Sequence, residues 1–99
     1  MDKLAPSNSN VPPVSVVVVN HNAGKALIDC LMSVASQARE VVVVDNASDE
    51  GDGILEQVER FGGEVRLLRS RVNLGFAGGC NLGIEQCSGV DVVLMIVVL

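Results

Sequence analysis

Apolar residues follow two patterns that alternate along the whole chain. Four short runs rich in valine and other apolar residues predict strands buried on both faces. These runs cover residues 14–19, 41–44, 65–68 and 92–99. Between them, apolar residues recur at intervals of three and four, which predicts amphipathic helices. The helices cover residues 24–37, residues 54–61 and a third segment that follows the loop 70–75 and ends at Ser88 and Gly89.

The order of these elements determines the fold class. Strands separated by helices of this length run parallel and are joined by right-handed crossovers. The chain is therefore predicted to be an α/β protein with an open, doubly wound parallel sheet in the order β-α-β-α-β-α-β. The third helix is expected to place four apolar residues on one face. These are Ala77, Cys80, Ile84 and Cys87.

A single domain is expected over residues 14–99, preceded by a flexible leader over residues 1–13. The leader is rich in Ser, Asn and Pro, and Pro12 and Pro13 cannot donate to a strand ladder. The longest apolar run, Val92 to Leu99, is far shorter than the roughly 20 residues of a membrane-spanning helix. No transmembrane segment is therefore predicted.

Charge and cysteine content narrow the function classes further. The net charge of -5 provides no positive surface for coating nucleic acid or an anionic membrane. A phosphate-bearing ligand would then need backbone amides or a metal ion. Cys30, Cys80 and Cys87 form no C-x-x-C pair, so neither a disulfide framework nor a zinc site is predicted. Reduced thiols and a cytoplasmic location are expected.

Polar residues gather directly after three of the predicted strands. Asn20-His21-Asn22 follows the first strand, Asp45-Asn46-Ala47-Ser48 follows the second, and the segment 73–81 follows the third. Ligands of open parallel sheets bind outside the carboxyl ends of the strands, near the point where the strand order reverses. The three loops are therefore expected to converge on one ligand.

Several of these residues also have a purely structural interpretation. Asn20 and Asn22 suit the cap of the first helix as well as the wall of a pocket, and His21 alone is more typical of an ordinary loop residue. Asp45 could hydrogen-bond its own turn. However, a carboxylate at the end of a buried strand needs a partner, and the ring N–H of uracil or thymine is one such partner.

Four glycines of the third helix, three of them in its opening turns, also require an explanation. Glycine costs up to about 1 kcal/mol relative to alanine inside a helix, so Gly75, Gly78, Gly79 and Gly83 indicate close approach of another group. That group is either the sheet beneath the helix or the phosphate oxygens of a ligand at the helix N-terminus. The sequence leaves both interpretations open.

Other phosphate-binding patterns do not match. Gly24-Lys25-Ala26 lacks the earlier glycine and the Ser or Thr of a P-loop, and no G-x-G-x-x-G follows the first strand. A receiver-type signalling domain would need acidic residues after the first strand to hold magnesium. This chain has Asn20-His21-Asn22 there, which argues strongly against that class.

Taken together, three blocks resemble the successive signatures of family-2 glycosyltransferases, especially the rhamnosyltransferase-like branch. The blocks cover residues 14–22, 41–48 and 73–83. The resemblance implies a GT-A-type domain that takes a sugar from a UDP- or dTDP-linked donor. It also implies transfer, with inversion, to a glycan or lipid-linked acceptor during assembly of cell-surface polysaccharide. A full-length protein of this kind would be cytoplasmic and peripheral at the inner face of the membrane.

The resemblance also implies roles for individual residues, by matching position. Asn20 and Asn22 would line the nucleotide pocket, and Asp45 would contact the base with Ser48 close by. The wall along the ribose and diphosphate would consist of Asn73, Gly75, Gly78, Gly79 and Asn81. A divalent ion, magnesium or manganese, would neutralise the leaving diphosphate.

The last residues depart from the family pattern. In the family, the fourth apolar run leads to a short acidic motif that helps to hold the metal, whereas here Val97, Val98 and Leu99 occupy those positions. Asp91 precedes the run and is expected at the opposite end of the sheet, so no catalytic or metal-binding residue is assigned. We interpret the chain as an N-terminal fragment with an incomplete sheet that is inactive alone. A non-catalytic nucleotide-binding or interaction module and a truncated product without function are the alternatives.

Overall fold

The computed structural model describes residues 13–49, 51, 53–88 and 91–97. They form four strands, three α-helices and one short 3-10 helix. In chain order these are β1 (Val14–Asn20), α1 (Lys25–Val34), η2 (Ala35–Gln37), β2 (Glu40–Asn46), α2 (Ile54–Phe61), β3 (Val65–Ser70), α3 (Gly75–Glu85) and β4 (Asp91–Ile96).

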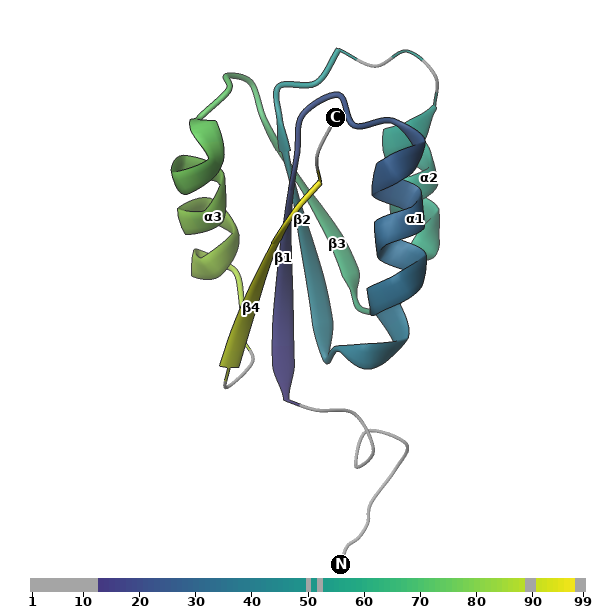
Figure 1. Ribbon diagram of the computed structural model, residues 1–99, viewed down its shortest axis with the longest axis vertical. Coiled ribbons are helices and arrows are strands. Elements are labelled where there is room, and N and C mark those ends of the chain that lie inside the picture. The colour runs from purple at the N-terminus through teal and green to yellow at the C-terminus, as the bar shows by residue number, and fades with distance from the viewer. Residues whose placement is uncertain (1–12, 50, 52, 89–90, 98–99) are drawn as a thin grey trace, which may run out of the picture.

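The strands form one parallel sheet in the order β3-β2-β1-β4. Helices α1 and α2 cover one face of the sheet, and α3 covers the other (Figure 1). The predicted α/β class, element order and doubly wound arrangement are confirmed. Because β2 and β3 lie on one side of β1 and β4 lies on the other, the strand order reverses between β1 and β4. Ligand sites of such sheets lie at the carboxyl ends of the strands near this point.

The boundaries differ from the predicted ones in a consistent way. The strands β1 and β2 continue through their polar ends, where Asn20 and Asp45 are still register partners. Hydrogen bonds to these side chains allow polar residues to stay in a buried strand. The predicted helix 24–37 is divided into α1 and η2, since Val34 leaves ideal helical geometry at φ -110°. Residues 1–12 of the predicted leader and residues 98–99 of the predicted fourth strand lie outside the described residues.

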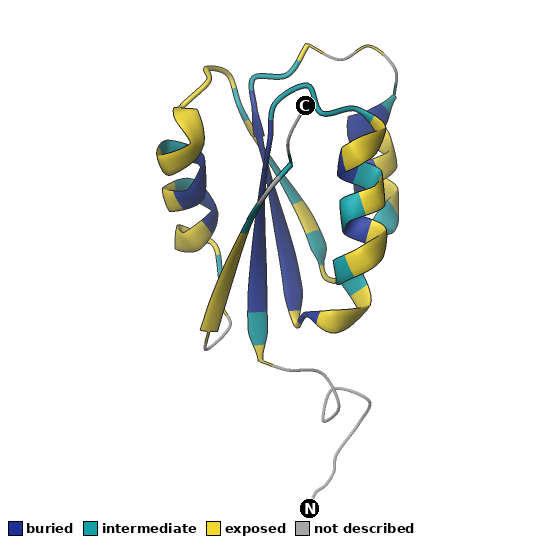
Figure 2. Ribbon diagram, in the orientation of Figure 1, coloured by how far each residue is buried: buried dark blue, intermediate teal, exposed yellow. Residues whose placement is uncertain are grey.

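The valine runs are explained by burial on both faces of the two central strands (Figure 2). Even-numbered valines of β1 and odd-numbered valines of β2 pack beneath α1 and α2 with Leu27, Leu31 and Val58. The remaining valines of both strands pack beneath α3 with Cys80. On the edge strand β4, Val92, Val93 and Leu94 are exposed. No helix among the described residues is long and apolar enough to cross a membrane.

Helix α3 packs on the sheet through two glycines together with Cys80, so the face expected from the sequence is confirmed only in part. Gly79, Cys80 and Gly83 are buried, whereas Ala77 is exposed and Ile84 is 40% exposed. The expected face was therefore wrong for those two exposed residues. A Cβ atom on Gly83 would lie 2.4 Å from Val17 Cγ1 and 3.1 Å from Val44 Cγ2. Close packing of helix on sheet explains this glycine, because any side chain would push α3 away from the core.

Replacing Gly83 with alanine tests this packing. We expect Gly83→Ala to lower the free energy of unfolding by roughly 1–3 kcal/mol, because overpacking of a dense core outweighs the better helix propensity of alanine. Urea denaturation of both proteins measures the difference. Gly51→Ala is the matched control, since a Cβ atom there meets nothing within 4 Å. Equal stability of the two variants would contradict the packing argument.

A buried carboxylate closes the amino end of the sheet. Glu40 is 5% exposed and accepts hydrogen bonds from Ser15 Oγ at 2.6 Å and from Ser88 Oγ at 2.9 Å. The backbone N–H of Ser88 also donates to it, and Arg66 Nη2 lies 2.9 Å from Oε1. Burial alone raises the pKa of Glu40. The hydrogen bonds and the Arg66 charge outweigh burial and lower this pKa from 4.5 to about 2.

This carboxylate links stability to pH. A lowered folded-state pKa stabilises the protein above pH 4.5, and the stabilisation is lost as pH falls toward about 2. At neutral pH we expect Glu40→Gln to lower the free energy of unfolding by roughly 2–3 kcal/mol. The variant should also lose less stability than the wild type between pH 5 and pH 2. Denaturation at several pH values measures both effects, with the exposed Glu59→Gln as control. An unchanged pH profile would refute the assignment.

Candidate functional site

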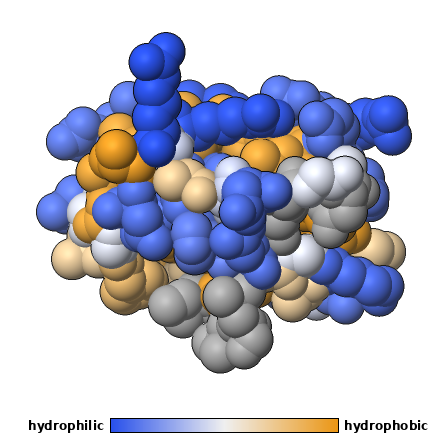
Figure 3. Space-filling view, turned by 90° about the horizontal axis from the view of Figure 1, so that it is seen from above, coloured by the Kyte–Doolittle hydropathy of each residue, from blue (hydrophilic) through white to orange (hydrophobic). Residues whose placement is uncertain are grey.

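The loops after β1, β2 and β3 meet at the carboxyl rim of the sheet, at the top of Figure 1. Seen from above, this end of the molecule shows mostly hydrophilic residues (Figure 3). Sheet register places Asn20 beside Asp45, and Asp45 beside Arg69. The three loops therefore meet at one rim, as predicted, and their convergence on one ligand stays a prediction.

A hydrogen-bonded network holds the carboxylate of Asp45 at this rim. Asp45 is 2% exposed. Asn20 Nδ2 donates to Asp45 Oδ1 at 2.9 Å, and the backbone N–H of Ser48 donates to Oδ2 at 3.1 Å. Each carboxylate oxygen can accept a further hydrogen bond, since it carries two lone pairs. Neutral donors therefore hold the carboxylate in place, and each of its oxygens can still accept a hydrogen bond from a ligand.

Asn20 and Asn22 join the first loop to the second. Helix α1 begins after Gly24 and has no side-chain cap, so capping of this helix does not explain either asparagine. The backbone N–H of Asn22 donates to Ser48 Oγ at 2.8 Å, and the backbone N–H of Asp49 donates to Asn22 Oδ1 at 3.0 Å. Asn22 adopts a left-handed conformation with φ 55°, which asparagine tolerates better than most residues.

The larger cavity at the rim has a volume of about 470 Å³. Its lining residues come from the ends of β2 and β3 and from the start of α2; they are Asp45, Ala47, Ser48, Leu55, Arg69, Ser70 and Arg71. Of these, Arg69 and Arg71 were not among the predicted site residues. The sequence offered one signal for them. They lie at the end of the third strand, in a chain with few cationic residues. They add two cationic side chains to the lining of the cavity that Asp45 also lines.

A smaller cavity, of about 230 Å³, lies at the rim on the α3 side. Its lining residues are Val19, His21, Asn46, Asn73, Gly75, Phe76 and Val97. Asn73 Oδ1 accepts a hydrogen bond from the backbone N–H of Gly75 at 2.8 Å. Gly75 has φ 76°, a conformation that few residues other than glycine adopt. His21 Nδ1 lies 2.5 Å from the carbonyl oxygen of Asn46. A carbonyl only accepts, so Nδ1 carries the proton of this hydrogen bond.

The other predicted residues of the third loop line neither of these cavities. Asn81 is exposed on the second turn of α3. A Cβ atom on Gly78 would lie 2.8 Å from Leu74 Cβ, and one on Gly79 would lie 2.9 Å from Val19 Cγ1. Contacts within the protein thus explain these two glycines, and ligand roles for Gly78, Gly79 and Asn81 stay predictions.

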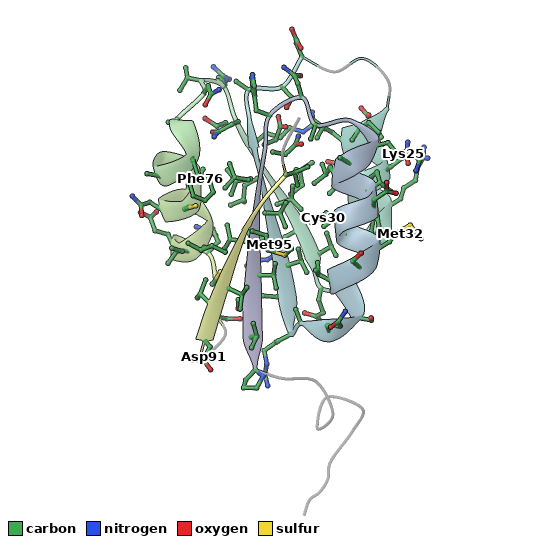
Figure 4. The ribbon with its side chains drawn as sticks, viewed as in Figure 1. Lys25, Cys30, Met32, Phe76, Asp91 and Met95 are labelled. Atoms are coloured by element: carbon green, nitrogen blue, oxygen red, sulfur yellow. The ribbon has the colours of Figure 1, made fainter. Side chains whose placement is uncertain are left out.

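Metal-ligating side chains do not cluster among the described residues. Within the parts of the chain that the structure covers, no group of three or more His, Cys, Asp or Glu residues is close enough to hold an ion. Val97 contributes an apolar wall to the smaller cavity, while Val98 and Leu99 lie outside the described residues. Asp91 begins β4 at the end of the sheet opposite the rim loops, as predicted (Figure 4).

Comparison with known proteins gives two similarities. The sequence model of the family described as "Glycosyl transferase family 2" matches residues 15–98. A protein of Haemophilus influenzae described as "Uncharacterized glycosyltransferase" is 29% identical over 84 residues, which cover 81% of this chain and 26% of that protein. The chain therefore spans only 26% of the length of this relative.

Proposed function

Since the chain belongs to glycosyl transferase family 2, we propose that it forms the nucleotide-binding part of an enzyme that uses a nucleoside diphosphate sugar. The observation that carries this proposal is the pair of cavities on either side of the carboxyl end of β2. Asp45 lines one cavity and its neighbour Asn46 lines the other. A nucleotide that crosses the end of β2 would contact residues from all three rim loops.

The base is proposed to occupy the larger cavity. The ring N–H of uracil or thymine would donate to Asp45, whose orientation is held by Asn20 and Ser48. Arg69 and Arg71 line the same cavity and would donate to ring carbonyl or phosphate oxygens. The positive charge of the two arginines is a further means of binding phosphate. It comes in addition to the backbone amides and the metal ion expected from the sequence.

The diphosphate is proposed to lie toward the smaller cavity. Leu74, the N-cap residue of α3, makes no side-chain cap, and among the described contacts Asn73 takes up only the N–H of Gly75, so the next backbone N–H groups at this end of the helix are available to a ligand. Such groups and the helix dipole favour phosphate oxygens. Asn73 and Gly75 form the adjoining wall.

The remaining parts of the proposal concern the whole protein and rest on the family resemblance. They are a UDP- or dTDP-linked donor of the rhamnosyltransferase-like type, transfer with inversion to a glycan or lipid-linked acceptor, and a role in cell-surface polysaccharide assembly at the cytoplasmic face of the membrane. Magnesium or manganese would assist departure of the diphosphate. The described residues supply no ligand set for this ion, so no step is assigned to it.

Removing the charge of Asp45 tests the base-binding role. We expect Asp45→Asn to weaken binding of UDP and dTDP at least about tenfold, because loss of a charge-assisted hydrogen bond costs about 1.5–3 kcal/mol. Titration calorimetry, with and without manganese, measures the affinities. Asp29→Asn is the control, because it removes the same charge from an exposed position on α1. Failure of the wild type to bind under every condition, or equal affinity of Asp45→Asn, would contradict the proposal.

A further inference from the structure

Asn46 connects three segments that surround the smaller cavity. It is 2% exposed at the end of β2. Its Nδ2 group donates to the carbonyl oxygen of Gly75 at 2.9 Å, and its Oδ1 accepts from the backbone N–H of Leu74 at 3.2 Å. Its own carbonyl oxygen accepts from His21 Nδ1. One residue thus holds both the loop after β1 and the start of α3.

Asn73 bonds the N–H of Gly75 from within the same loop, whereas the two hydrogen bonds of Asn46 join the start of α3 to a different element, β2. The N-cap residue of α3 is Leu74, whose side chain cannot cap a helix. Asn46 holds the backbone of Leu74 and Gly75 from a neighbouring strand without capping the helix, and the space it needs is left by Gly79. A Cβ atom on Gly79 would lie 3.0 Å from Asn46 Nδ2.

The two hydrogen bonds also account for the orientation of this asparagine. The Nδ2 group faces a carbonyl and Oδ1 faces an N–H, so the amide matches both partners in only one orientation. Both polar atoms of this side-chain amide already have a partner within the protein, and the residue is 2% exposed. The amide therefore acts on a ligand mainly through the backbone that it holds at the start of α3, at Leu74 and Gly75.

We propose that Asn46 is a positioning residue for the diphosphate half of the nucleotide. Its side chain fixes the start of α3 at the distance from β2 that the diphosphate requires, while the base in the larger cavity depends on Asp45 instead. This inference rests on the proposed function. The proposed role differs from a general structural role because Asn46 affects binding of the diphosphate and not of the base.

Comparing ligands with and without phosphates separates the two halves. Affinities for uridine and for UDP are measured by titration calorimetry on the whole chain, for the wild type and for Asn46→Ala. We expect the variant to bind uridine within about twofold of the wild type, while the advantage of UDP over uridine falls about tenfold, the loss typical of charge-assisted hydrogen bonds. Amide hydrogen exchange at Leu74 should become faster in the variant, because its acceptor has been removed.

Val58→Ala is the control for destabilisation alone. Val58 is a fully buried residue of α2 in the core on the side of the sheet away from α3, so its truncation lowers stability without changing the smaller cavity. We expect this variant to keep the wild-type ratio of UDP to uridine affinity. If Asn46→Ala does not fold, Asn46→Ser is measured in its place, since its hydroxyl is too short to make both hydrogen bonds.

The outcomes distinguish this inference from the proposed function. If the wild type binds neither uridine nor UDP, the proposed function itself is contradicted. A wild type that prefers UDP, with the preference unchanged in the Asn46 variants, overturns the positioning role alone. An equal loss of uridine and UDP affinity also overturns it, because the residue would then be only structural.

Discussion

The structure depends on the burial of β1 and β2 on both faces. Val16–Val19 and Val41–Val44 are at most 6% exposed, so polar residues of these strands are confined to their ends. At the amino end, Ser15 and Glu40 form a closed network with Ser88 and Arg66. At the carboxyl end, polar side chains instead line two open cavities. Burial of β1 and β2 thus gives the sheet one end that stabilises the fold and one end that is a candidate binding site.

The alternation of side chains along β2 divides the binding end in two. Asp45 and Asn46 are neighbours in a strand, so they face opposite sides of the sheet. Asp45 faces the cavity beside α2, and Asn46 faces the cavity beside α3. A nucleotide has a flat base with ring donors and an anionic diphosphate, and these halves suit the two environments. Membership of glycosyl transferase family 2 agrees with this division.

The sequence predicts the fold well because its signals are local. The valine runs and the helical spacing place each strand and helix within a few residues, and the order of elements leaves a parallel sheet as the solution. The face of α3 was not predictable from hydrophobicity. Glycines carry no apolar side chain, yet Gly79 and Gly83 form the face that packs. Arg69 and Arg71 were missed because their part in the site depends on register with β2, which joins residues distant in the sequence.

The central claim is that the carboxyl rim binds a nucleotide across the end of β2. The most direct test is a titration of the isotopically labelled chain with UDP, followed by amide resonances in NMR spectra. The account predicts shifts at Ala47, Ser48, Arg71 and Gly75, which line the two cavities, and none at Glu40 or Ser88 at the other end of the sheet. Shifts confined to the amino end, or to the outer surface of α1 and α2, would contradict it.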